Sequence, residues 1–347
     1  MTVNLLRSQD LHFSQFNENP SLINPALTGA TSPIRASVNN KDQWRSITNA
    51  YKTFGASFET RFNPSSWQQV DKFRSMTFKE KSVGRLAAGI SFYNDKAGDG
   101  NMGLTQTNLS LATFIPISKK SFFSLGIQAS LAQRKVDQSK LIFSNQYNGS
   151  VYDPNQTSRE NFSSLNYSYT DLGAGILWSY SADEKKLNGN KQIKANIGFA
   201  VYHLTRPHQN YFISDNRLFM KYVIHGDFLV SLKNPNKAIA PTYLLQMQGS
   251  SVEFLLGTMF KYYMNSDSKY TGIVKRNCIG YGVYYRNNDA IIVSMLLEWQ
   301  EQFAVIMSYD LNVSPLVTAS SMRGGFEITL RYTPPKAFLY QKKETPP

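Results

Sequence analysis

The chain has 347 residues, and its 37 Lys and Arg against 24 Asp and Glu give a formal net charge of +13. At roughly 150 residues per domain, this length allows about two ordinary domains or one large all-β unit. Only 18% of residues are charged, yet 13% are aromatic and the mean hydropathy is −0.35. This composition argues against disorder and indicates that apolar and polar side chains are sorted onto two faces.

The counts exclude several classes of protein. The single cysteine, Cys278, rules out an intramolecular disulfide and a cysteine zinc cluster, and we expect a small buried side chain there. The longest apolar stretch, residues 290–297, is far shorter than the roughly 20 residues of a membrane-spanning helix. The basic residues are scattered, without a basic cluster or a nucleic-acid-binding module, so we expect no nucleic-acid partner.

The N-terminal region divides into two segments. Residues 1–8 lack the cleavage site of a signal peptide, and we interpret them as the remnant of a leader. Residues 9–30 contain aromatic side chains and two Asn-Pro pairs, Asn19-Pro20 and Asn24-Pro25. Proline disfavours helix in the residue before it, and asparagine side chains satisfy local backbone groups. We therefore predict a rigid, irregular segment that either fills a lumen as a plug or lies beneath it as a strap.

From residue 31 onward the dominant pattern has a period of two. Phe326, Ile328 and Leu330 alternate with Glu327 and Thr329, so the two sets lie on opposite faces of a strand. Fourteen segments follow such a pattern, near residues 34–44, 51–62, 84–95, 102–117, 121–137, 166–182, 191–204, 219–233, 239–249, 251–265, 272–286, 289–299, 301–311 and 324–334.

One face of these segments is aliphatic and aromatic, and the other is mostly Gly, Ala, Ser, Asn and Gln. Lipid-facing apolar residues around a polar lumen give this signature in outer-membrane barrels. The sequence therefore predicts an all-β protein: a transmembrane antiparallel β-barrel of about 14 strands over residues 31–335. A basic C-terminal tail, residues 336–347, follows it. A soluble β-sandwich is the least favoured alternative, because its apolar face needs a second sheet to cover it.

The connections differ in length. Residues 95–101, 138–164 and 206–218 form long polar connections, whereas residues 118–120, 249–250 and 287–288 are tight turns. We predict that the long connections lie outside the cell and the short ones inside, as is usual for bacterial barrels.

Catalytic and metal-binding patterns are not apparent. His203 and His208 lack a matching third ligand, and residues 95–101 lack the spacing of a calcium loop. Four inward charges are better explained as lumen charges that pair with one another and with basic partners than as a catalytic set. They are Glu298, Asp310, Glu327 and Arg331. We expect no enzyme activity and no cofactor, and we expect contacts with lipid and lipopolysaccharide.

Several motifs occur together in chain order. Residues 9–16 read Gln-Asp-Leu-His-Phe-Ser-Gln-Phe, and residues 23–29 read Ile-Asn-Pro-Ala-Leu-Thr-Gly. Lys-Asp-Gln-Trp ends at Trp44, a Gly-to-Pro motif spans residues 198–207, and Tyr309-Asp310 precedes Gly325-Phe326-Glu327. Together these motifs resemble the PorP/SprF family of outer-membrane proteins of the type IX secretion system in Bacteroidota.

The resemblance implies a barrel that serves secretion, gliding motility or cell-surface anchoring, with a mature chain that begins near Gln9. The expected partner is the C-terminal domain of a secreted cargo protein or adhesin, with the type IX translocon and periplasmic ring proteins as further partners. Two alternatives remain open: an outer-membrane diffusion channel or uptake transporter, and a scaffold that links the outer membrane to the periplasmic secretion-motor rings.

These interpretations single out three groups of candidate residues. The N-terminal structural motif comprises Phe13, Gln15, Phe16, Pro20, Asn24, Pro25 and Gly29. The barrel motif and rim comprise Trp44, His203, Pro207, Tyr309, Asp310 and Glu327. The candidate partner-contacting loop residues are Asp95, Asp99, Arg159, Arg206, Arg217 and Lys269.

Overall fold

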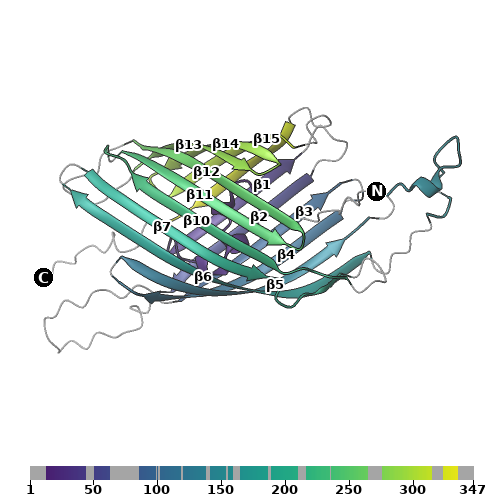
Figure 1. Ribbon diagram of the computed structural model, residues 1–347, viewed down its shortest axis with the longest axis horizontal. Coiled ribbons are helices and arrows are strands. Elements are labelled where there is room, and N and C mark those ends of the chain that lie inside the picture. The colour runs from purple at the N-terminus through teal and green to yellow at the C-terminus, as the bar shows by residue number, and fades with distance from the viewer. Residues whose placement is uncertain are drawn as a thin grey trace, which may run out of the picture.

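Fourteen antiparallel strands close into a barrel in the computed structural model of the chain (Figure 1). The structure describes residues 13–43, 51–62, 86–98, 100, 102–118, 120–137, 141–153, 155–158, 165–186, 189–209, 216–234, 236–264, 276–314 and 323–334. The predicted fold class, a 14-stranded antiparallel barrel with an irregular N-terminal segment, is therefore confirmed.

The strands follow one another around the barrel in chain order, and β1 pairs with β16 to close it. They are β1 (Ile34–Gln43), β2 (Tyr51–Phe62), β3 (Leu86–Ala97), β4 (Met102–Pro116), β5 (Ser121–Lys135), β6 (Asn166–Lys186), β7 (Gly189–Tyr202), β10 (Lys221–Ser231), β11 (Lys237–Gln248), β12 (Ser251–Tyr263), β13 (Cys278–Arg286), β14 (Ala290–Trp299), β15 (Phe303–Asn312) and β16 (Arg323–Tyr332). Two short strands, β8 (His208–Gln209) and β9 (Asn216–Arg217), pair outside the barrel wall.

The period-two pattern sets the direction of the side chains. On β5, Ile127 faces outward and is 62% exposed, whereas its neighbour Gln128 faces the lumen and is 2% exposed. The same alternation holds on β16, where Phe326 and Leu330 are exposed and Glu327 is buried. Both faces predicted from the sequence are thus confirmed, because the ladder register leaves only one way to place each set.

The connections define two ends of the barrel. We call the end where β1 begins and β16 ends the termini end, and the opposite end, where residues 136–165 join β5 to β6, the loop end. The tight turns after β11 and β13 lie at the loop end together with the long connections. The predicted separation of long and short connections is therefore wrong for these two turns, because alternating strands place every second connection at the same end.

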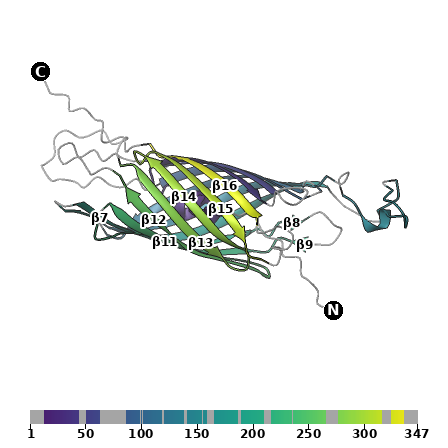
Figure 2. The ribbon, with the colours of Figure 1, turned by 90° about the horizontal axis from the view of Figure 1, so that it is seen from above.

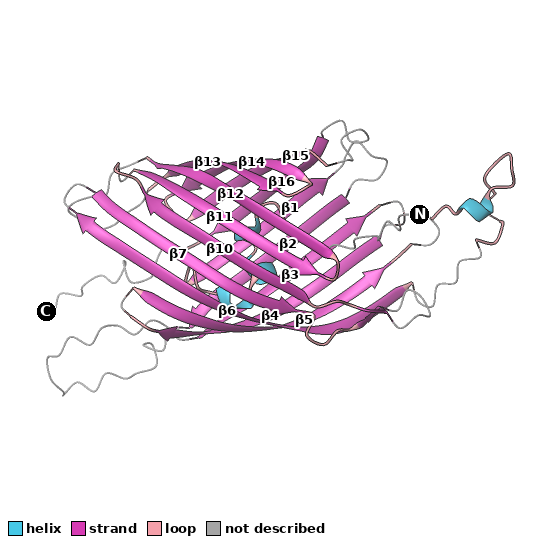
Figure 3. Cartoon of the chain, in the orientation of Figure 1, coloured by secondary structure: helices cyan, strands magenta, loops and turns pink. Residues whose placement is uncertain are grey.

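The irregular N-terminal segment lies inside the barrel, where Figures 2 and 3 show its short helices enclosed by the strands. Its elements are η1 (Phe16–Glu18), α1 (Pro20–Ile23) and η2 (Pro25–Leu27). Its apolar side chains pack against inward residues of the wall and form the main buried cluster: Phe16, Ile23, Ala26, Leu27, Leu177, Ala200, Tyr202, Val223, Leu244, Leu255, Tyr284, Ala290 and Ile292.

Helices do not supply membrane spans in the part of the chain that the structure describes, since none there is both long and apolar enough to cross a bilayer.

Candidate functional site: the occupied lumen

Proline and asparagine shape the segment that crosses the lumen. Pro20 and Pro25 each occupy the first turn of a short helix, where the missing N–H leaves no hydrogen bond unmade. The Asn24 side chain accepts a hydrogen bond from the Ala26 N–H at 2.9 Å and so caps η2. These local rules make the path of residues 19–28 rigid before any contact with the wall is counted.

Asn24 also joins the segment to the barrel wall. Its amide Nδ2 donates to the Ile176 carbonyl at 2.9 Å and lies 3.1 Å from Nε2 of His225, so one fully buried side chain reaches β6 and β10. Glycines of the wall lie beside this contact, and a Cβ on Gly175 or Gly126 would collide with Asn24 or with the backbone of Ala26. Small inward residues therefore make room for the segment.

A first polar cluster lies toward the loop end. Glu327 accepts the backbone N–H groups of Ser14 and Gln15 at 2.7 and 3.1 Å. The Ser14 hydroxyl donates to Asp310 at 2.8 Å, and Asp310 also receives Arg286 at 2.9 Å. The Asp310 and Glu327 carboxylates thus hold the start of the described segment against β15 and β16.

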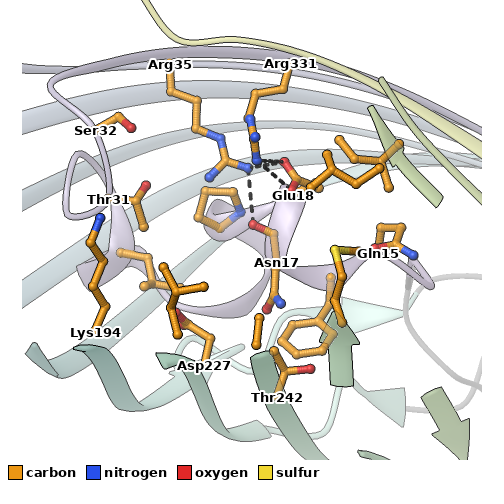
Figure 4. A pocket seen from close by; sticks show the side chains of 18 of the residues that line it. Gln15, Asn17, Glu18, Thr31, Ser32, Arg35, Lys194, Asp227, Thr242 and Arg331 are labelled. Carbon is orange, nitrogen blue, oxygen red and sulfur yellow. Dashed lines mark hydrogen bonds and ion pairs between the residues drawn. The ribbon is translucent and has the colours of Figure 1, made fainter. Parts of the chain in front are cut away.

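A second polar cluster lies toward the termini end and centres on Glu18 (Figure 4). Glu18 pairs with Arg35 of β1 at 2.7 Å and with Arg331 of β16 at 2.8 Å, and Arg331 reaches Glu298 of β14 at 2.7 Å. Burial by itself raises the pKa of Glu18, but Arg331 and Arg35 outweigh it and hold that pKa below its ordinary value. The carboxylate is therefore charged, and it ties η1 to the seam where the barrel closes.

A third contact holds the segment where it leaves the lumen. Gly29, with a positive φ of 66°, donates its N–H to Glu59 at 2.6 Å, and its carbonyl accepts Arg61 Nε at 2.8 Å. Glycine suits this backbone conformation because it has no Cβ to clash. Phe13, at the other end of the segment, lies against Tyr93 with ring centroids 6.1 Å apart.

Between the segment and strands β10 to β16 lies a cavity of about 310 Å³. Its walls combine Glu18, Arg35 and Arg331 with the apolar side chains of Phe16 and Met259. Among the described residues, no group of three or more His, Cys, Asp or Glu is arranged to hold a metal ion. The cavity lining offers charged, hydrogen-bonding and apolar groups to a bound molecule.

Comparison with known proteins identifies the family. A family model described as type IX secretion system membrane protein PorP/SprF matches residues 5–332. The chain belongs to the PorP/SprF family. The resemblance drawn from the motifs is thereby confirmed, and this PorP/SprF protein is an integral outer-membrane β-barrel related to secretion. A comparison with curated protein sequences gave no match.

Solved structures of other proteins match the chain at low sequence identity and with TM-scores below 0.5. The Ralstonia pickettii toluene transporter TbuX is 8% identical, with a TM-score of 0.43 over 90% of this chain and 92% of that one. The KdgM porin is 6% identical, with a TM-score of 0.37 over 87% and 99% of the two chains. BamA from Haemophilus ducreyi is 9% identical, with a TM-score of 0.40 over 86% and 69%. These likenesses concern the fold alone.

The rim residues of the PorP/SprF motifs occupy different environments. His203 is buried, and its Nδ1 lies 2.9 Å from the Asp171 carboxylate. The Pro207 carbonyl accepts the Leu218 N–H at 2.9 Å and closes the base of the connection between β7 and β10. Tyr309 is 40% exposed and faces outward, away from its neighbour Asp310 in the lumen.

The candidate loop residues also lie in different parts of the structure. Asp95 belongs to β3 rather than to a loop, and it accepts the Thr53 hydroxyl at 2.6 Å. Arg206 and Arg217 are exposed at the loop end. Four sequence candidates lie outside the described residues: Trp44, Asp99, Arg159 and Lys269.

Several residues that form ion pairs inside the barrel were not singled out from the sequence. Glu18, Arg35 and Arg286 form ion pairs there, and Asp171 is the partner of His203. A signal was present, because Arg35 and Arg286 occupy inward positions of predicted strands, where a charge needs a partner. The sequence does not show which partner each charge takes: Arg35 meets Glu18 17 residues away, and Glu18 also meets Arg331 313 residues away.

Proposed function

We propose that this PorP/SprF protein is a non-enzymatic barrel that receives or anchors the C-terminal domain of a secreted cargo protein or adhesin at the cell surface. The observation that carries the proposal is the connection between β5 and β6, which stands clear of the barrel at the loop end (Figure 1). We orient this end toward the outside, because the longest connections of bacterial barrels are extracellular.

This connection is ordered by its own hydrogen bonds. Gln146, at the end of η5 (Ser144–Gln146), donates its side-chain amide to the Gln156 carbonyl at 3.0 Å and accepts the Asp153 N–H through its backbone carbonyl at 2.8 Å. The structure nevertheless exposes Ile142 by 74% and Val151 by 61%. A preorganised element that presents apolar and aromatic side chains is a favourable docking surface, because little ordering entropy is lost on binding.

The occupied lumen weighs against the alternative of a diffusion channel. A 14-stranded barrel is wide enough to need filling, and here the chain's own N-terminal segment occupies the interior with buried ion pairs at Glu18 and Asp310. A secretion component that binds its cargo through surface loops needs no open pore.

The test is a variant with Ile142→Ser, Tyr147→Ser and Val151→Ser in the connection. We expect the barrel to remain folded in the outer membrane while surface display of the co-expressed adhesin falls several-fold, measured by antibody labelling of intact cells. The matched control is Lys233→Ser with Lys237→Ser, two exposed residues at the termini end. Normal adhesin display in the triple variant contradicts the proposal.

A further inference from the structure

The cavity beside the N-terminal segment is open at the termini end and closed toward the middle of the barrel. Its rim contains exposed residues, Thr31, Lys194 and Glu301, whereas its inner wall contains buried ones, Gln15 and Tyr284. A blind, partly apolar cavity of about 310 Å³ is at the lower end of the range for small-molecule and peptide-terminus sites.

The charges of the cavity do not all cancel within the protein. Arg35 and Arg331 are committed to Glu18 and Glu298. Lys194 and Lys261 also line the cavity, and in the described part of the chain neither forms an ion pair. Lys261 lies within electrostatic reach of Glu18 and Asp227 without contacting them.

The rim carboxylate Glu301 is committed to Arg276 at 3.6 Å, so in the described lining a single uncommitted carboxylate, Asp227, remains beside these two lysines. Asp227 lines the same wall and accepts the Asn196 amide at 2.7 Å. The uncommitted groups therefore leave one positive charge in excess, which suits a ligand with one negative charge.

Two buried polar atoms in the cavity wall also lack partners. Gln15 Nε2 and Thr242 Oγ1 make no hydrogen bond, although their side chains are only 6% and 3% exposed. Both residues line the cavity and are labelled in Figure 4. A buried polar group without a hydrogen-bond partner destabilises the protein. A ligand whose oxygen atoms accept hydrogen bonds from these two groups removes that cost, and this contributes to its binding free energy.

We propose that this cavity binds a short extended peptide segment through a terminal carboxylate, with Lys194 and Lys261 as the charge partners. Backbone carbonyls of the peptide accept hydrogen bonds from Gln15 Nε2 and the Thr242 hydroxyl, and its apolar side chains contact Met259 and Leu296. A fatty acid fits less well, because its alkyl chain leaves both polar atoms unsatisfied. The inference goes beyond the surface anchoring proposed above, since it concerns the opposite end of the barrel.

The experiment uses the purified full chain in detergent micelles and a library of random tripeptides with free C-terminal carboxylates. Retained peptides are measured by equilibrium dialysis and mass spectrometry against the same library with C-terminal amides. We expect carboxylate peptides to be retained about tenfold better than amides, since each lost charge-assisted contact weakens binding by about that factor. Lys261→Gln and Lys194→Gln each reduce retention by a similar factor, whereas Lys237→Gln, an exposed lysine outside the cavity, leaves it unchanged.

A second variant distinguishes a loss of peptide binding from a loss of folding. Thr242→Val keeps the shape of the side chain and removes its hydroxyl, so peptide retention falls several-fold while the β-sheet circular dichroism spectrum is kept. Equal retention of carboxylate and amide peptides, or retention of neither, overturns the proposal. Retention of sodium decanoate in place of the tripeptides, lost in Lys261→Gln, overturns it in favour of a lipid-type anion.

Discussion

Single buried charges decide how the N-terminal segment is held. Glu18 is the clearest case, because its carboxylate contacts arginines from β1 and β16, the two strands that close the barrel. Removal of one partner from a buried ion pair leaves the other charge without compensation and typically costs several kcal/mol. The same cost applies to the loss of Asp310, which accepts hydrogen bonds from Ser14 of the segment and Arg286 of the wall.

The lowered pKa of Glu18 predicts that the segment loosens in acid. Because the folded-state pKa lies below the ordinary value of 4.5, the carboxylate stabilises the docked segment fully above that pH. This stabilisation is lost as the pH falls from 4.5 through the lower folded-state pKa. We expect hydrogen exchange of amides 13–33, corrected for the intrinsic rate at each pH, to rise over this window.

Glu18→Gln keeps the shape of the side chain and removes its charge, so it separates this effect from general acid unfolding. The variant should lose about 2–4 kcal/mol of docking free energy at neutral pH and show a smaller acid-dependent rise, because Asp310 and Glu327 still hold the segment and still become protonated in acid. Glu301→Gln, an exposed carboxylate at the same end, is the control. An acid-dependent rise of wild-type size in Glu18→Gln refutes the assignment.

At the scale of single strands, the outward face must match the bilayer. Ile127 lies in the middle of β5 and is 62% exposed, so Ile127→Arg places a charge in the hydrocarbon region. We expect this change to destabilise the folded barrel in lipid by about 2–4 kcal/mol. The free energy of unfolding is measured by urea titration in vesicles. Ile142→Arg, at a 74% exposed position of the β5–β6 connection, should cost much less.

The inward face of β5, in contrast, must leave room for the N-terminal segment. A Cβ at Gly126 collides with the backbone of Pro25 and Ala26, which cannot move aside as a flexible side chain does. Gly126→Ala should therefore displace η2 and weaken docking by about 1–3 kcal/mol, seen as faster hydrogen exchange of amides 20–30. Ala129→Val, an outward change on the same strand, should leave those amides as protected as in the wild type.

At the scale of the whole molecule, the segment and the barrel form one folded unit. Because the segment occupies the lumen, deletion of residues 13–30 should raise the conductance of the purified barrel in planar bilayers several-fold above that of the full chain. A full chain that conducts as well as the deletion variant contradicts a lumen-filling role. A disulfide between Ser14→Cys and Asp310→Cys, which replaces a 2.8 Å contact, should keep the low conductance.

Much of this architecture could be predicted because strand periodicity is a local property. All fourteen segments inferred from the alternation correspond to strands of the barrel, and Asn24-Pro25 marks the rigid turn that the structure contains. The interpretation failed for single residues near the ends of strands. Asp95 was expected in a loop but lies within a strand, and Tyr309 faces outward beside an inward Asp310.

The sequence by itself determined the strand count, the two faces of every strand and the family, because alternation and motif order are written along the chain. Only the tertiary structure decided that Glu18 meets Arg35 and Arg331, and that a cavity remains beside η1. The physical reason is that closure of the barrel brings together residues as distant as 18 and 331. Contacts of that kind depend on the register of the whole sheet, and no local pattern encodes it.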